Sequence, residues 1–142
     1  MSKEKGHRKH HSFRVSWDGT AVAGVDRVSP LVRAVDVITV RDGGAPGGGQ
    51  HSTPGRIFSE PVTLERPRGG DTAFGEWAGS ARAIAARKDV TVEVLNADGA
   101  VIAAYRLLRC WPSEYRVSLL ERGTRAAVVE QLRLENDGWD PV

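Results

Sequence analysis

The sequence predicts a mainly β domain, an antiparallel β-sandwich or partly closed barrel with one packed α-helix. Two observations favour this fold class: short apolar segments with a period of two are separated by turn residues, and the period changes to that of a helix in one stretch only. In addition, a length of 142 residues and a hydrophobic content of 40% suit a single domain with a buried core. Packed antiparallel sheets covered by one helix account for this pattern.

The first predicted strands form a hairpin. Residues 13–17 alternate apolar and polar side chains, and residues 20–25 return as a second short strand. Asp18-Gly19 supplies the tight turn, because glycine accepts positive φ. Residues 31–41 form a long strand that is rich in valine and isoleucine and has apolar side chains on both faces. Such a strand needs cover on two sides.

The middle of the chain contains a further strand and the helix. Residues 57–66 are predicted as a strand, with Pro61 at an edge or bulge position. Residues 71–88 are predicted as the helix, with Asp71 as its N-cap and two basic residues at its last turn. Its apolar face consists of Phe74, Trp77, Ala78, Ala81, Ile84 and Ala85.

Extended segments complete the chain. They are residues 90–94, 101–108, 115–120 and 126–134. A turn at residues 96–99 joins the first two, and Trp111-Pro112 is predicted to bend the chain before the third.

The composition excludes several classes of protein. The net charge is +2 and the pI about 9.0, with 20 Lys and Arg against 18 Asp and Glu, a balance that is not typical of a nucleic-acid binder. The longest apolar run, residues 101–105, is too short to span a membrane. No apolar segment follows the basic N-terminus, so we expect no signal peptide and a cytoplasmic site of synthesis. A single cysteine, Cys110, excludes an internal disulfide framework and a multi-cysteine zinc site.

Basic residues gather at the N-terminus. Residues 1–12 are predicted as a disordered basic tail, and residues 13–142 as the β domain. The basic and imidazole groups of the tail are Lys3, Lys5, Arg8, Lys9, His7, His10 and His11. Nothing rigid positions these histidines, so no metal site is expected there.

A glycine-rich segment, residues 41–56, interrupts the strands and includes Gly47-Gly48-Gly49. It is not a Walker phosphate loop, because a Gln-His pair and a strand follow where that motif has Gly-Lys-Ser/Thr and a helix. From the residues alone, two interpretations stay open. The segment is either a plain flexible hairpin loop or a functional loop, since long structureless loops are uncommon in compact domains.

The residues offer no catalytic or cofactor site. Cys110 precedes Trp111-Pro112, where a small thiol packs well, so core packing is favoured over a nucleophilic role. His51 is the only histidine outside the tail, and it lies in the glycine-rich segment. No Ser-His-Asp order, HExxH motif or nucleophile elbow is present. The sequence therefore predicts no catalytic residue, no cofactor and no metal.

Glu130 is an unusual charge in an apolar row. It shares a predicted strand face with Val128, Leu132 and Leu134, where a buried and unpaired charge is costly. Either a solvent-exposed rim position or a salt bridge to an arginine across a subunit contact explains it.

Tryptophans also indicate buried surface. Trp77, Trp111 and Trp139 are candidate core residues. Trp139 lies near the C-terminus beside Gly138 and Pro141, where a free monomer would leave it uncovered. An aromatic residue in that position suggests an interface.

These motifs, in this order, resemble the tube proteins of contractile phage tails and related contractile injection systems, over nearly the whole chain after the tail. In the first half they are Phe13-Arg14-Val15, Asp18-Gly19, Ala23-Gly24-Val25, Val28-Ser29-Pro30-Leu31, Arg41-Asp42-Gly43-Gly44 and Pro54-Gly55. In the second half they are Val62-Thr63-Leu64-Glu65-Arg66, Asp71 with Phe74 and Trp77, Asp98-Gly99, Cys110-Trp111-Pro112-Ser113-Glu114-Tyr115, Val129-Glu130-Gln131-Leu132 and Glu135-Asn136-Asp137-Gly138-Trp139.

The chain departs from the family pattern in a few places. Pro30 stands where glycine is common, and Asn136-Asp137-Gly138 where the family often has a segment like His-Glu-Gly. These departures leave open two roles, the main tube subunit or a tube-initiating or adaptor paralogue near the baseplate.

The resemblance implies hexameric rings that stack into a hollow tube. Sheets of neighbouring subunits would join to line the lumen, which would pair open strand edges and cover the second apolar face of residues 31–41. The glycine-rich segment would then be an assembly loop, ordered by the next subunit or ring. The residues that this interpretation places at inter-subunit contacts are Arg41, Asp42, Gly43, Gly44, Pro54, Gly55, Arg56, Trp111, Glu130, Glu135 and Trp139.

The implied partners are further copies of the chain, sheath and baseplate proteins, and cargo in the lumen, with nucleic acid only in a true phage tail. The implied location is a phage-tail-like particle assembled after cytoplasmic synthesis. Two alternatives belong to other classes: a small β-domain that binds nucleic acid or an anionic surface through its basic tail, and an enzyme that uses Cys110 or His51.

Overall fold

The protein is described here by a computed structural model, which describes residues 11–41, 49–68, 71–80, 86–123 and 125–142. Over these residues the protein is mainly β with one helix, which confirms the predicted fold class. The elements are β1 (Ser12–Trp17), β2 (Thr20–Val22), β3 (Arg27–Val28), β4 (Arg33–Arg41), β5 (Gln50–Ser59), β6 (Val62–Pro67), α2 (Ala73–Gly79), β7 (Lys88–Leu95), β8 (Val101–Arg122), β9 (Arg125–Glu135) and β10 (Trp139–Pro141).

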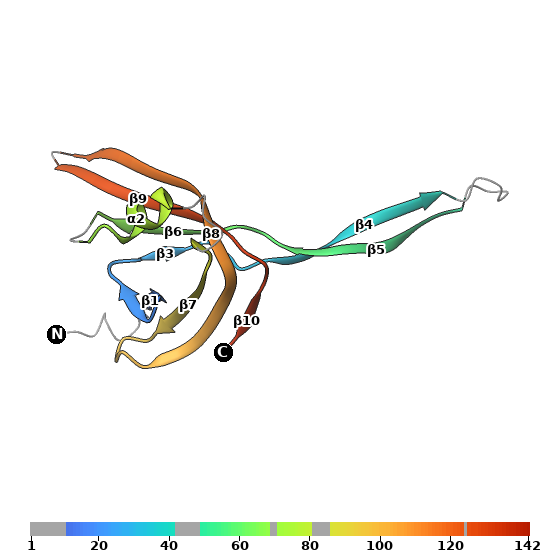
Figure 1. Ribbon diagram of the computed structural model, residues 1–142, viewed down its shortest axis with the longest axis horizontal. Helices are drawn as coiled ribbons and strands as arrows, with labels where there is room; N and C mark the ends of the chain where they lie inside the picture. Colours follow the sequence, from blue (N-terminus) through green and yellow to red (C-terminus); the bar gives the residue numbers. More distant parts are fainter. Residues whose placement is uncertain (1–10, 42–48, 69–70, 81–85, 124) are drawn as a thin grey trace.

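All strand pairs are antiparallel and form two sheets of very different size. The large sheet has the order β2-β1-β7-β8-β9-β6-β3, with β10 also paired to β8. It curves around the core and α2, and we call this part the body (Figure 1). The small sheet consists of β4 and β5 alone and projects from the body as a long ribbon, which we call the arm (Figure 1).

Strand β8 joins the two halves of the body. Its first part pairs with β7 and β10, and its second part pairs with β9. Between them Arg109 has a positive φ of 49°, and the register shifts between Pro112 and Glu114. Two segments predicted as separate strands, residues 101–108 and 115–120, are therefore one strand of 22 residues. The sequence predicted a bend at Trp111-Pro112, and here the chain changes partners instead of leaving the sheet.

The core lies inside the curved sheet, under α2. The helix contributes Phe74 and Trp77, and the indole ring of Trp77 packs 4.7 Å from that of Trp17 between ring centroids. Strands from both halves of the sheet supply the other buried residues, which include Val15, Val62, Leu64, Val90, Val92, Leu107, Cys110, Leu132 and Leu134.

The helix is shorter than predicted where the structure describes it. It begins at Ala73 with Thr72 as its N-cap, so the prediction of Asp71 as N-cap was wrong by one residue. Asp71 still stabilises the start of the helix, because its Oδ1 accepts a hydrogen bond of 3.1 Å from the Ala73 N–H. The helix ends at Gly79, and Ser80 donates its N–H to Trp77 O at 3.0 Å, which tightens the last turn. Residues 81–85 of the predicted helix lie outside the described residues, and Lys88 begins β7.

Other boundaries also differ. The predicted strand at 57–66 is divided between two strands, β5 and β6. The sheet pairing is interrupted at Glu60-Pro61, because Pro61 has no backbone N–H to donate. Residues 50–56, predicted as loop, belong to β5. The second strand ends at Val22, before a turn in which Gly24 has a φ of 78°, and β10 was not predicted. Ser12 begins β1, and residues 1–10 of the predicted tail lie outside the described residues.

Candidate assembly surfaces

The arm exposes apolar side chains on both faces. Its strands pair from Arg33↔Ser59 at the root to Arg41↔Gln50. Val37 is 72% exposed and Ile57 is 64% exposed. Val35, Ile38 and Val40 are also exposed. The prediction that this strand has apolar side chains on both faces is confirmed. In a single copy of the chain these side chains are exposed to solvent.

One glycine lies at a close approach between the two strands of the arm. A Cβ on Gly55 would lie 2.9 Å from Ile38 Cδ1 and 3.1 Å from the Cβ of Asp36. Asp36 occupies the bulge, where the register shifts between Val35 and Val37. Gly55 therefore lets the two strands approach closely at the point where the ribbon is irregular.

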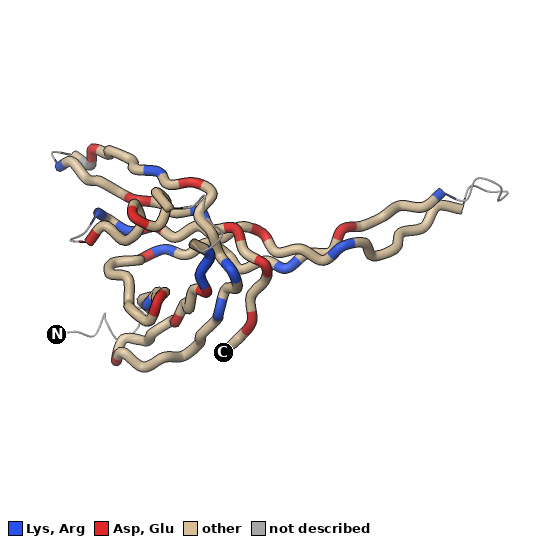
Figure 2. Tube along the Cα trace, viewed as in Figure 1, with Lys and Arg blue, Asp and Glu red and all other residues tan. Residues whose placement is uncertain are grey.

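Charges are sparse along the arm, as Figure 2 shows. The charged residues of β4 and β5 are Arg33, Asp36, Arg41 and Arg56. A long ribbon with exposed apolar side chains and few charges is suited to pairing with another chain.

A second exposed apolar surface lies at the end of the molecule opposite the arm, on the β8–β9 tip (residues 115–123 and 125–128; Figure 1). Beyond the pair Pro67↔Val129, where β6 ends, β9 continues paired only with β8. The register places Tyr115, Val117 and Leu119 in one row, opposite Leu132, Glu130 and Val128. This row begins beside the core and runs beyond it, so that Leu119 is 79% exposed.

Next to β6, the other face of these strands is polar and carries charges of both signs. It is slightly hollowed, with a volume of about 230 Å³ lined by Thr63, Glu114, Arg116, Gln131 and Arg133. Opposite charges lie side by side on it. The Arg116 and Glu114 side chains are 2.8 Å apart, and Arg133 Nε lies 3.5 Å from an oxygen of Glu135.

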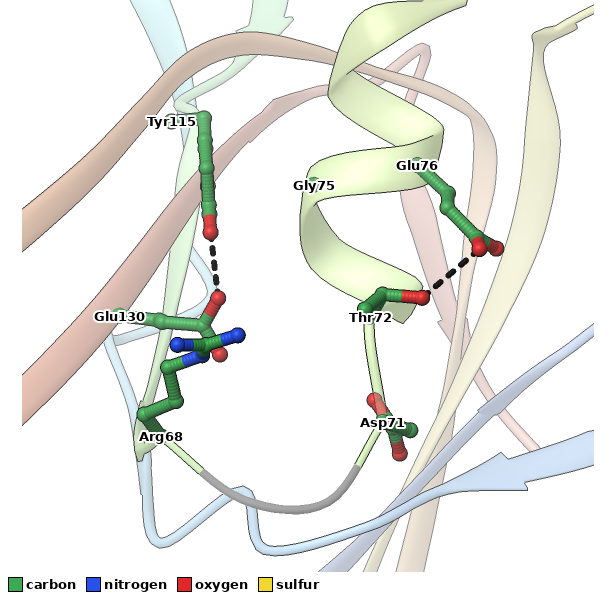
Figure 3. Close-up of a pocket in the computed structure, with 7 residues that line it drawn as sticks. All are labelled: Arg68, Asp71, Thr72, Gly75, Glu76, Tyr115 and Glu130. Atoms are coloured by element: carbon green, nitrogen blue, oxygen red, sulfur yellow. Dashed lines mark hydrogen bonds between the residues drawn. The ribbon is translucent and has the colours of Figure 1, made fainter.

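Glu130 is buried under the helix and not at a rim. It is 2% exposed, and its Oε1 accepts a hydrogen bond of 3.0 Å from Arg66 Nε. The other carboxylate oxygen accepts a hydrogen bond from the Tyr115 hydroxyl (Figure 3). Both sequence-based alternatives for Glu130 are therefore corrected: it is not in solvent, and the arginine that pairs with it belongs to the same chain.

Arg66 is the centre of this network, although in the sequence it stands out only as the last residue of a family motif. Its guanidinium donates to Ala23 O at 3.0 Å and lies 2.8 Å from Asp71 Oδ1. It also lies 4.2 Å from the ring centroid of Phe74. A signal was present in the sequence, since Arg66 follows Val62 and Leu64 at the period of a strand's inward face.

A pocket of about 340 Å³ opens beside this network, between α2 and the β8–β9 tip (Figure 3). Its lining residues are Arg68, Asp71, Thr72, Gly75, Glu76, Tyr115 and Glu130. The hydrogen bond from Arg66, together with that from the Ala73 N–H, lowers the pKa of Asp71. The hydrogen bond to Glu130 raises the pKa of Tyr115, because ionised tyrosine could not donate to a carboxylate.

The residues predicted at inter-subunit contacts do not gather in one site. Arg41, Pro54, Gly55 and Arg56 lie on the arm. Glu135 lies at the end of β9, where Ser113 Oγ donates to it at 2.6 Å. Asp42, Gly43 and Gly44 lie outside the described residues. Trp111 is partly buried, with the guanidinium of Arg87 5.8 Å from its ring centroid. The predicted contacts of these residues with other subunits stay predictions.

Trp139 is better covered by its own chain than the sequence suggested. It is partly buried on β10, packs edge-on against Tyr105 at 5.9 Å between centroids, and lies under the guanidinium of Arg33. Its indole N–H is buried and has no hydrogen-bond partner among the residues that the structure describes.

The two candidate nucleophiles have opposite surroundings. Cys110 is fully buried, which confirms its predicted place in the core, and burial together with the nearby Asp89 carboxylate raises its pKa to about 12. His51 is exposed on β5, paired with Val40, and is not in a loop as predicted. Within the described ranges, no group of three or more His, Cys, Asp or Glu residues could hold a metal ion. The helix described here is also too short and too polar to cross a bilayer.

The comparison with protein families decides the identity. The model of the family described as T4-like virus tail tube protein gp19 matches residues 9–140, nearly the whole chain. The chain belongs to the T4-like tail tube protein family. This confirms the family resemblance seen in the sequence and the predicted role of a structural tube subunit.

Solved structures support the fold of this tail tube protein. A chain of the extracellular contractile injection system PVC, in its extended sheath–tube complex, has a TM-score of 0.74 and 22% identity, covering 92% of this chain and 89% of that one. A chain of the anti-feeding prophage baseplate has a TM-score of 0.71 and 16% identity, covering 94% and 92%. Hcp1 from Flavobacterium johnsoniae has a TM-score of 0.53 and 14% identity, covering 92% and 99%. No curated protein matches the chain.

Proposed function

We propose that this tail tube protein forms hexameric rings that stack head to tail into the hollow inner tube of a contractile injection system or phage-like tail. Sheath and baseplate proteins are its partners, and cargo travels in the lumen. Its role is mechanical and involves no catalysis.

The observation that carries this proposal is the pair of uncovered apolar surfaces at opposite ends of the molecule. The arm leaves Val37 and Ile57 in water at one end, and the β8–β9 tip leaves Leu119 in water at the other. A monomer gains nothing from such surfaces, whereas a head-to-tail stack brings opposite ends of successive copies together and buries them.

Open strand edges support ring closure. In the described part of the chain, β8 from Ser113 onward pairs on one side only, with β9. Strand β3, the last in the sheet order, pairs only with β6 among the described residues. Pairing of these two edges between neighbours would continue the sheet from copy to copy, and a closed ring leaves no edge free.

The polar face of β6, β9 and β8 is suited to the lumen. Its side chains carry both signs of charge in adjacent pairs, such as Arg116 with Glu114. A wall of this kind has no extended field of one sign that would hold a charged cargo in place.

Electron microscopy of the purified protein tests the assembly. Rings with sixfold symmetry, or tubes built from them, are the expected result. A species that stays monomeric at high concentration by light scattering, and is absent from native particles, would contradict the proposal. Short stacks that never elongate would favour the second candidate, a tube-initiating or adaptor paralogue near the baseplate.

A further inference from the structure

The root of the arm is attached to the C-terminal end of the chain. Arg33, the first residue of β4, donates a hydrogen bond from Nη2 to the backbone oxygen of Trp139. The same guanidinium lies 4.5 Å from the centroid of the Trp139 ring, and its Nη2 lies 4.0 Å from Asp140 Oδ1. One arginine thus makes a hydrogen bond, a cation–π contact and a weak ion pair with two consecutive residues.

The second strand of the arm is held by the same segment. Asn136 Nδ2 donates to the backbone oxygen of Glu60 at 3.1 Å, one residue after β5 ends. Glu60 in turn donates its N–H to Val32 O at 3.1 Å, which ties the two strands together at the root. Both strands therefore leave the body through contacts with residues 136–140, which we call the C-terminal latch.

The latch itself is fixed to the body. The N–H of Asp137 donates to Leu108 O, and the N–H of Leu108 donates to Gly138 O, each at 2.9 Å. Gly138 has a φ of 136°, which favours glycine and lets the chain turn into β10. The Trp139 side chain then packs against Tyr105 of β8. These contacts give the latch a firm position on β8.

We propose that the C-terminal latch sets the direction in which the arm leaves the body, and that Arg33 is its positioning residue. Beyond its root, the arm forms a sheet only with itself within the described residues. A ribbon attached by one end pivots at that end, so an angular change at Arg33 produces a displacement that grows along the arm, from Val37 to Arg41. The inference rests on the proposed function, since a fixed direction matters to the protein only if the arm must meet another copy.

Distance measurement between two spin labels on the unassembled protein tests the latch directly. One label replaces Val37 on the arm and the other replaces Asp98 in the β7–β8 turn, both exposed positions. Cys110 stays unlabelled because it is fully buried. The variants are Arg33→Ala, Arg33→Lys and the matched control Arg56→Ala, which removes an exposed arginine of β5 away from the root.

We expect Arg33→Ala to broaden the distance distribution about twofold, because the arm then samples more than one direction. Arg33→Lys should broaden the distance distribution to a lesser degree, since lysine keeps the charge but loses the planar stacking on Trp139. Arg56→Ala should match the unsubstituted protein. An unchanged distribution in Arg33→Ala overturns the inference.

We expect the Arg33 variants to fold, because the Arg33 side chain is 47% exposed and its substitution should leave the body intact. Should Arg33→Ala fail to fold, Arg33→Gln provides the same readout. The measurement needs no tube. If the parent protein forms no rings, the proposed function fails while the latch can still be demonstrated; if it forms tubes and the arm of Arg33→Ala keeps one direction, only the latch fails.

Discussion

In the body, β6 buries Val62 and Leu64 completely, whereas in the arm, Val37 of β4 and Ile57 of β5 stay largely in water. Both regions come from the same kind of sequence, extended and rich in β-branched residues. Within one copy, β6 is covered by β9, α2 and the core, whereas the arm has only its own two strands. A pattern of apolar residues thus predicts that a strand will be buried, and it does not say whether the same copy supplies the cover.

The largest expected effect concerns the buried ion pair of the body. Replacing Glu130 by alanine leaves Arg66 charged and almost fully buried, so we expect a loss of about 3–5 kcal/mol in the free energy of unfolding. Urea denaturation followed by circular dichroism measures it. Glu135→Ala, a change of the same type at the sheet end, is the control and should cost less than about 1 kcal/mol. Equal losses in the two variants would show that the network is not what holds β6 and β9 to the helix.

The rate of thiol alkylation should differ strongly between the body and the arm. Cys110 has a pKa of about 12 and is fully buried, whereas a cysteine introduced at Val37 of the arm would be open to solvent. At pH 8 we expect the arm thiol to react with iodoacetamide on the order of a thousand times faster than Cys110, because only the thiolate attacks. Mass spectrometry of each peptide over time provides both rates. Fast alkylation of Cys110 in the folded protein would contradict its place in the core.

Matched valine truncations compare burial directly. Val62→Ala removes two buried methyl groups and should cost about 2–3 kcal/mol of stability. Val37→Ala removes the same atoms from an exposed site and should change the stability of the monomer by less than about 0.5 kcal/mol. Chemical denaturation at a protein concentration where only monomer is present makes the comparison.

The same pair also tests assembly. Val37→Ala should raise the concentration needed for rings or tubes to form, while monomer folding is unchanged. If Val37→Ala assembles like the parent protein, this part of the arm is not the surface that another copy covers.

The smallest effect is a dependence on pH. The pKa of Asp71 is lowered by Arg66, so its contribution to stability is present above the pKa of an unfolded aspartate, near 4, and is lost as the pH falls through the lower folded value. Because the Asp71 side chain is 41% exposed, we expect Asp71→Asn to cost under about 1 kcal/mol at pH 7. The difference from the parent protein should vanish in strong acid. A difference that persists there would mean that the amide disturbs the start of α2 for another reason.

Much of the body could be predicted from local patterns. The alternation in residues 13–17 and 90–94, the Asp18-Gly19 turn and the ordered family motifs led to the right fold class and family. What failed depended on distant partners. The unbroken course of β8 depends on a change from β7 to β9, and β10 exists because β8 offers it an edge.

The assembly surfaces were harder to predict, for a related reason. Glu130 stood out as a charge in an apolar row, but its partner Arg66 is 64 residues earlier in the chain, and only the pairing of β6 with β9 brings the two together. Gly55, chosen from a family motif, is explained by its close approach to Ile38. Arg33 gave no signal at all in the sequence, because its role depends on where the C-terminus returns.

Strand β8 has a mechanical consequence. Its backbone runs through both halves of the sheet, with β7 and β10 flanking its first part and β9 its second. A pull along this strand would load many of its hydrogen bonds in shear at once, instead of opening them one after another from an end. The two halves of the sheet are thereby linked by covalent bonds, so a force applied to one half is passed along β8 to the other.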